Sequence, residues 1–178
     1  MRALIVYETV FGATEAVAQG IAEGLADTMD VETMDVRKAP TRLPDDVDLM
    51  VVGGPAPTLL GEALPWLDRR AATRERLAHL EEQPRVRDWL EALEVGHVPA
   101  GAAAFETRAA QHHLSMSGTV PVERGLRRKG VTVTHSPETF TVVGTTYLPA
   151  HGEVERARHW GEHLAAQLDT LGFECHAV

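Results

Sequence analysis

A short segment of hydroxyl-bearing residues and glycine has the residue types that bind a phosphate group. It joins an apolar run to a helical pattern and comprises Thr9, Val10, Phe11, Gly12, Ala13 and Thr14. The backbone N–H groups of such a loop and the positive end of the next helix dipole point the same way. Gly12 permits turn conformations closed to other residues, and Thr9 and Thr14 add hydroxyl donors. The segment has neither the Gly-Lys-Ser/Thr of a P-loop nor the glycine set of a dinucleotide fingerprint. It therefore predicts a terminal phosphate held by neutral donors.

The segments around this loop alternate between strand and helix patterns. Residues 3–7 form a continuous apolar run, which is typical of a strand buried in a parallel sheet. A helix of about 13 residues follows, for which Thr14 is the expected N-cap. The other expected strands are at residues 31–36, 48–52 (ending at Gly53), 100–105, and 131–134 with 140–143. The other expected helices are at residues 73–80, 84–93, 118–129 and 153–168.

This order of elements predicts an α/β fold. Strands that alternate with helices form a parallel sheet covered by helices on both faces. We therefore expect a three-layer α/β/α sandwich with a five-stranded parallel sheet. No repeat, low-complexity tract or linker divides the chain, so residues 1–178 are expected to form a single domain.

Ligands of open α/β sheets bind outside the carboxyl ends of the strands. The loops expected there span residues 8–14, 53–66 and 106–118. The candidate residues from the second and third loops are Pro55, Ala56, Pro57, Thr58, Thr107 and Arg108. Trp66 is a further aromatic side chain that could reach a ligand there, whereas Trp89 and Trp160 fall on apolar helix faces and are expected in the core.

The first loop resembles the phosphate loop of the flavodoxin family. That loop reads Ser/Thr-x-Thr-Gly-x-Thr, or has an aromatic third residue, after an apolar strand that ends in Tyr. Thr9, Gly12 and Thr14 match it, and Phe11 takes the variant position. Residues 51–55 (Val-Val-Gly-Gly-Pro) resemble the family's second flavin loop, and the order of elements extends the likeness over essentially the whole chain.

The resemblance implies a flavodoxin-like fold with FMN as its cofactor. Backbone N–H groups of residues 9–14 would hold the phosphate, and residues 53–60 and 106–112 would border the flavin ring. The chain would then act in electron transfer, with a redox partner protein or a small-molecule acceptor. It departs from the family because Pro57, Thr58, Leu59 and Leu60 stand where an aromatic residue is often found.

Two other functions stay open at this point. The long segment 55–84 could wall a substrate pocket, which would suit an FMN-dependent NAD(P)H or quinone reductase. The missing stacking aromatics would instead suit a flavin-free binding or regulatory module on the same fold. No nucleophile–base motif is present, so any chemistry is expected to come from a cofactor.

Composition excludes several classes of function. The net charge of −9 argues against nucleic acid as a partner. No apolar run approaches the roughly 20 residues that span a bilayer. The N-terminus shows no secretory leader and Cys175 is the single cysteine, so a cytoplasmic location is expected. His112 and His113 are adjacent and have no companion ligands, so no metal site is expected.

Overall fold

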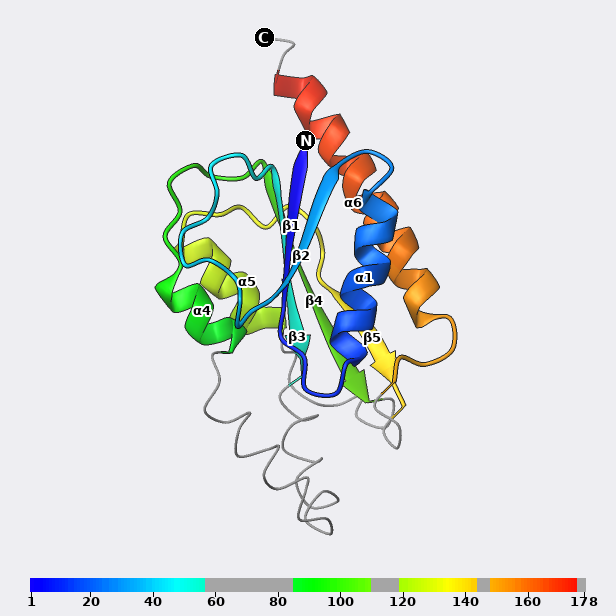
Figure 1. Ribbon diagram of the computed structural model, residues 1–178. Coiled ribbons are helices and arrows are strands. Elements are labelled where there is room, and N and C mark those ends of the chain that lie inside the picture. The colour runs from blue at the N-terminus through cyan, green and yellow to red at the C-terminus, as the bar shows by residue number, and fades with distance from the viewer. Residues whose placement is uncertain (57–84, 110–118, 144–147, 176–178) are drawn as a thin grey trace.

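The computed structural model describes residues 1–56, 85–109, 119–143 and 148–175, with side chains of the last segment described up to Leu168. A five-stranded parallel sheet lies between two pairs of helices (Figure 1). The strands are β1 (Arg2–Tyr7), β2 (Asp30–Asp35), β3 (Leu49–Pro55), β4 (Gly101–Ala109) and β5 (Glu138–Val142). The helices are α1 (Ala13–Leu25), α4 (Val86–Ala92), α5 (Thr119–Arg128) and α6 (Glu153–Cys175).

The strand order confirms the predicted fold class. The strands lie in the order β2-β1-β3-β4-β5 and every neighbouring pair is parallel. Helices α1 and α6 cover one face of the sheet, and α4 and α5 cover the other (Figure 1). This order is that of the flavodoxin-like three-layer sandwich, whose ligand crevice lies between β1 and β3.

Burial on both faces explains why β1 is a continuous apolar run. Ala3 and Ile5 pack on the α1–α6 side, and Leu4 and Val6 pack on the α4–α5 side. All four side chains are at most 1% exposed. A strand with both faces covered has no solvent face to occupy with polar residues, so it loses the alternation of a one-sided strand.

Strands β3 and β4 are longer than the sequence predicted. Residues 53–55 and 106–109, expected in loops, continue the ladder, and Gly53 pairs with Phe105. A Cβ atom at Gly53 would collide with the ring of Phe105, so only glycine at this position leaves room for the ring. Pro55 is the last residue of β3, where the missing N–H of proline is tolerated.

Other element boundaries were predicted with mixed success. Of residues 131–134, Val133 forms only an isolated bridge with Ala102, and β5 lies further on, at Glu138–Val142. Helix α6 runs past the expected end at Leu168 to Cys175.

Trp89 is buried and donates its Nε1–H to the carbonyl of Pro40 at 2.9 Å, which confirms its core position. The expected helix at residues 73–80 lies outside the described residues.

Two glycines allow α1 and α6 to pack in direct backbone contact. A Cβ atom at Gly24 would collide with the carbonyl oxygen of Arg158, and one at Gly161 with the carbonyl oxygen of Ile21. This packing brings the backbones of α1 and α6 close together on one face of the sheet. Among the helices that the structure describes, none has the length and apolar character needed to cross a membrane.

Candidate functional site

The carboxyl ends of β1, β3 and β4 meet at one edge of the sheet, which lies toward the bottom of Figure 1. The β1–β3 ladder ends with Tyr7 opposite Gly53, and the β3–β4 ladder ends with Pro55 opposite Thr107. The loop after β1 therefore lies beside the last residues of β3 and β4. We call residues 8–14, 53–56 and 106–109 together the carboxyl-edge site.

Gly12 forms the backbone turn that starts α1. Its φ angle is 92°, in the left-handed region, and it is the N-cap residue of the helix. Its N–H donates to Oγ1 of Thr9 at 3.0 Å, so the Thr9 hydroxyl closes the loop on itself. In the described part of the chain, no side chain caps this helix. The N–H groups of its first turn therefore point out of the loop without an intrahelical acceptor.

Thr14 does not cap α1, contrary to the prediction from sequence. The helix already begins after Gly12, because glycine adopts the positive φ at low cost, so Thr14 lies within the first turn. It is 2% exposed, and its Oγ1 lies 2.9 Å from Oγ1 of Thr107, which is 0% exposed. The two hydroxyls thus join the start of α1 to the end of β4.

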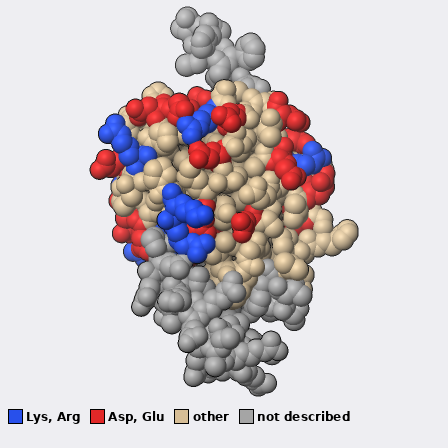
Figure 2. Space-filling model, in the orientation of Figure 1, with Lys and Arg blue, Asp and Glu red and all other residues tan. Residues whose placement is uncertain are grey.

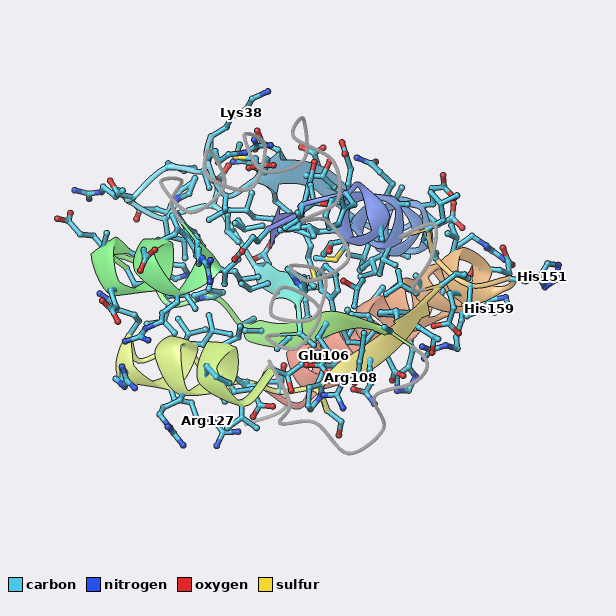
Figure 3. All side chains as sticks on the ribbon, turned by 90° about the horizontal axis from the view of Figure 1, so that it is seen from below. Lys38, Glu106, Arg108, Arg127, His151 and His159 are labelled. Carbon is cyan, nitrogen blue, oxygen red and sulfur yellow. The ribbon has the colours of Figure 1, made fainter. Side chains whose placement is uncertain are left out.

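A buried ion pair lies at the end of β4. Glu106 is 1% exposed, and one of its carboxylate oxygens accepts a hydrogen bond from Arg108 at 2.5 Å. Thr139 of β5 donates to the same oxygen at 3.1 Å. Figure 3, which looks onto the carboxyl edge of the sheet, shows Glu106 and Arg108 next to each other near β4. The pair places a positive guanidinium, 14% exposed, next to the predicted ligand site.

Glu8 links the carboxyl-edge site to α4. Its backbone N–H donates to the carbonyl of Gly53 at 2.9 Å, and its carboxylate accepts the N–H of Val86 at 3.1 Å. Burial raises the pKa of this carboxyl above its ordinary value, although the hydrogen bond from Val86 opposes the shift. Glu8 thus fixes the first residue of α4 against the loop that follows β1.

Two further ionisable groups lie where β1 and β2 end. Burial, together with the negative charge of Glu15, raises the pKa of Tyr7 to about 12, and the Tyr7 hydroxyl donates to Glu15 at 3.2 Å. Burial also acts to raise the pKa of Asp35, but hydrogen bonds from Arg37 outweigh it and the net shift is downward. Tyr7 therefore stays neutral and Asp35 stays charged at neutral pH.

The structure brings most of the predicted site residues together. Residues 9–14 form the loop and the first helical turn, and Ala56 donates its N–H to the carbonyl of Thr107 at 2.9 Å. Pro55, Thr107 and Arg108 belong to strands rather than to the predicted loops. Predictions at Pro57, Thr58, Trp66, His112 and His113 lie outside the described residues.

Three further polar residues of this region are Glu8, Glu106 and Thr139. Glu8 and Glu106 fall within the predicted loops but were not among the candidate site residues, and sequence reasoning missed Thr139. Glu8 directly follows β1 and Glu106 occupies a buried strand position, and a charged residue at such a place marks a candidate site. Thr139 comes from β5, and no sequence pattern links it with Glu106. Within the described ranges, no three His, Cys, Asp or Glu side chains come together as a metal site.

Comparison with known proteins gives matches at the level of structure. No family model matches the sequence, and neither does any curated protein. An archaeal flavodoxin superposes with a TM-score of 0.57 at 17% identity, covering 95% of this chain and 99% of its own. Flavodoxin 1 of Bacillus cereus gives 0.62 at 15% identity, covering 96% and 98%. A flavodoxin of Streptococcus pneumoniae TIGR4 gives 0.62 at 17% identity, covering 94% and 99%.

These likenesses span nearly the full length of both proteins in each comparison. Because the sequence identities are only 15–17%, these matches show similarity of fold alone. The chain has the flavodoxin-like fold, with its candidate site at the carboxyl edge of the sheet where that fold binds ligands.

Proposed function

We propose that this chain binds FMN at the carboxyl-edge site and acts in electron transfer. The observation that carries the proposal is the start of α1, which is shaped by Gly12 and lacks a side-chain cap in the described residues. It lies where the flavodoxin-like fold binds ligands, and the structural neighbours are flavodoxins by name. When bound, FMN would supply the electron-carrying chemistry.

The donor set fits a phosphate group. The N–H groups of the first helical turn and the positive end of the dipole favour an anion there. Thr9 and Thr14 supply hydroxyls, and in the pair with Thr107 either hydroxyl can be the donor. With Thr107 as the donor, Thr14 keeps its own hydrogen for a phosphate oxygen. A Cβ atom at Gly12 would meet no atom of the described residues within 4 Å, which is consistent with a ligand approaching the backbone here.

The remaining predicted residues would border the flavin ring. Pro55 and Ala56 end β3, and Thr107 and Arg108 lie beside them near the end of β4. Their part would be to exclude water and to present backbone groups and a positive charge to the ring, which tunes the electron affinity of a flavin. Pro57 and Thr58 are proposed for the same border from sequence.

Titration with FMN and with riboflavin tests the phosphate part of the proposal. Riboflavin lacks the phosphate and cannot form the charge-assisted hydrogen bonds that the loop would make to it. FMN is therefore expected to bind on the order of tenfold more tightly than riboflavin, or better. Thr9→Ala should weaken FMN binding and leave riboflavin binding nearly unchanged. Thr132→Ala removes an exposed hydroxyl elsewhere and serves as the matched control. A folded protein that binds neither flavin in calorimetry contradicts the proposal.

The second candidate function is a flavin-free binding module on the same fold. One observation favours it: Trp89 is 4% exposed in the core and Trp160 packs against Phe105 and Phe140, so neither tryptophan is available to stack on a flavin. The absence of FMN binding in the titration would support this module.

Electron transfer is tested on FMN-loaded protein. Photoreduced protein should pass electrons to an added acceptor such as a cytochrome. Rapid mixing with NADH or NADPH separates a carrier from a reductase. If the nucleotide alone bleaches the flavin, the function is that of an FMN-dependent NAD(P)H or quinone reductase and not that of an electron carrier.

A further inference from the structure

A groove with a basic rim lies between α4 and α5, on the face of the sheet away from α1. Its volume is about 550 Å³. Four basic side chains line it, namely Arg87, Arg124, Arg128 and Lys129. The residues of this groove are separate from the carboxyl-edge site. We call it the α4–α5 groove.

Close packing of the two helices forms the floor of the groove. Leu90 is buried, and a Cβ atom at Gly125 would lie 2.9 Å from its Cδ1. The absence of a side chain at Gly125 therefore lets Leu90 pack directly against α5, and both residues line the groove. The long side chains on either side of it remain exposed or half-buried.

The positive charge of the groove is only partly compensated. Arg87 donates to the Glu91 carboxylate at 3.2 Å, and Lys129 donates to the Glu91 backbone carbonyl at 2.8 Å. Arg124 and Arg128 make no ion pair with any residue that the structure describes. They lie one helical turn apart, about 6 Å, where like charges repel. An anion between them would remove this repulsion.

The positive charge of the groove is opposite in sign to the net charge of the chain. The chain has a net charge of −9, and Figure 2 shows acidic side chains spread around the edge of one face. Arg127 points away from α4 in Figure 3 and pairs with Glu123, so it does not add to the groove. Four cations against the single carboxylate of Glu91 make the groove locally positive.

We propose that the α4–α5 groove docks an acidic segment of a partner protein. The cations are spread along more than one helical turn of α5 and across to α4, so an extended ligand is needed to meet them all. They lie on the rim rather than in an enclosed pocket, and rim charges steer and align a macromolecular partner. Arginine suits the task because its guanidinium binds carboxylates through paired hydrogen bonds. Docking here does not depend on FMN.

A labelled peptide tests the proposal on the full-length protein. The probe has about 12 residues and carries Glu side chains four residues apart, to match the turn spacing of α5. A second peptide carries Gln in place of every Glu. Fluorescence anisotropy is measured for the unaltered protein, Arg124→Glu, Arg128→Glu and the control Lys38→Glu. Lys38 lies on another side of the molecule from α5, and its reversal changes the net charge by the same amount (Figure 3).

The expected result is selective weakening. Arg124→Glu and Arg128→Glu should each weaken binding of the Glu peptide on the order of tenfold, while Lys38→Glu changes it by less than about twofold. Binding should also weaken as salt rises, because exposed charges are screened beyond about 10 Å at 0.1 M. Equal weakening by all three variants, or equal binding of the Gln peptide, would overturn the proposal. So would tighter binding of an RNA oligonucleotide or of ATP with the same dependence on Arg124.

Discussion

Thr14 in α1 and Thr107 in β4 face each other through their hydroxyl groups, 2.9 Å apart and 93 residues apart in the sequence. Both side chains are at most 2% exposed. The contact fixes the first turn of α1, and with it the loop after β1, against the end of β4. The position of the carboxyl-edge site therefore depends on a pair that is distant in sequence.

Substitution of either threonine by valine should destabilise the fold. Thr14→Val leaves the buried Thr107 hydroxyl without this partner, which costs about 1–2 kcal/mol in the free energy of unfolding. The double variant with Thr107→Val should lose less than the sum of the two single losses, since no hydroxyl is then left unpaired. Urea unfolding of the four proteins measures this coupling. Strict additivity would show that the hydroxyls do not interact.

Gly12→Ala should destabilise the fold through its backbone alone. The φ angle of 92° is costly for alanine by about 1–2 kcal/mol, and the new Cβ would contact nothing within 4 Å. Gly130→Ala is a matched control, because Gly130 has a φ of 79° and equally open space. Both variants should lose similar free energy of unfolding, whereas only Gly12→Ala should weaken FMN binding. Equal loss of FMN affinity in both would contradict a phosphate site at Gly12.

Glu8→Gln should change how stability depends on pH. Burial raises the pKa of Glu8 above 4.5, so the folded protein holds this proton more tightly than the unfolded chain. The Glu8 contribution therefore becomes less favourable as pH rises from about 4.5 through the folded pKa. Glutamine keeps an oxygen for the Val86 N–H without the charge. The variant should thus gain stability relative to the unaltered protein at neutral pH, and this gain should vanish below about pH 4.

Chemical unfolding at several pH values measures the difference between these two proteins. A constant difference from acid to neutral pH would mean that the charge of Glu8 is not destabilising. Asp35→Asn is a useful comparison of opposite sign, because the net shift of the Asp35 pKa is downward. Asp35→Asn should lower the free energy of unfolding at neutral pH, and the difference from the unaltered protein should become smaller in acid.

Arg108→Met should destabilise the fold more than a similar change at the surface. It leaves the carboxylate of Glu106, 1% exposed, without its guanidinium, and breaking a buried pair costs about 3 kcal/mol or more. Arg87→Met breaks an exposed pair with Glu91 and should cost less than about 1 kcal/mol. Adding Glu106→Gln to Arg108→Met should recover part of the loss. Equal effects at both arginines in urea unfolding would contradict a buried role for the pair.

The sequence was sufficient to predict the fold class and the place of the loop. Residues 3–7 and 49–52 are apolar without interruption, which is typical of strands covered on both faces. Gly12 lies between two threonines in the loop after the first of these strands, and this pattern predicted the start of a helix and a candidate ligand site. These are local properties of the chain, so pattern reasoning reached them.

Tertiary structure decided the details of the site. The sequence does not show that Gly53 and Phe105 are neighbours. In the structure they pair, and the Phe105 ring occupies the space that a Cβ atom at residue 53 would need. The β3–β4 ladder continues past this pair, beyond the predicted strand ends. Thr14 has the residue type of an N-cap, yet its hydroxyl faces Thr107 because the backbone of Gly12 already starts the helix.

The loop that follows β1 was thus identifiable from its own residues as a candidate phosphate site. The contacts that hold this loop were not, because Thr107 reaches Thr14, and Val86 reaches Glu8, only through the parallel pairing of strands and the return of α4 to the sheet. Thr107 was predicted as a site residue, but its contact with Thr14 was not. Local residue types set which groups can donate to a ligand. Contacts between residues far apart in the chain set where those donors are held, since hydrogen-bond geometry depends on the packed backbone rather than on sequence spacing.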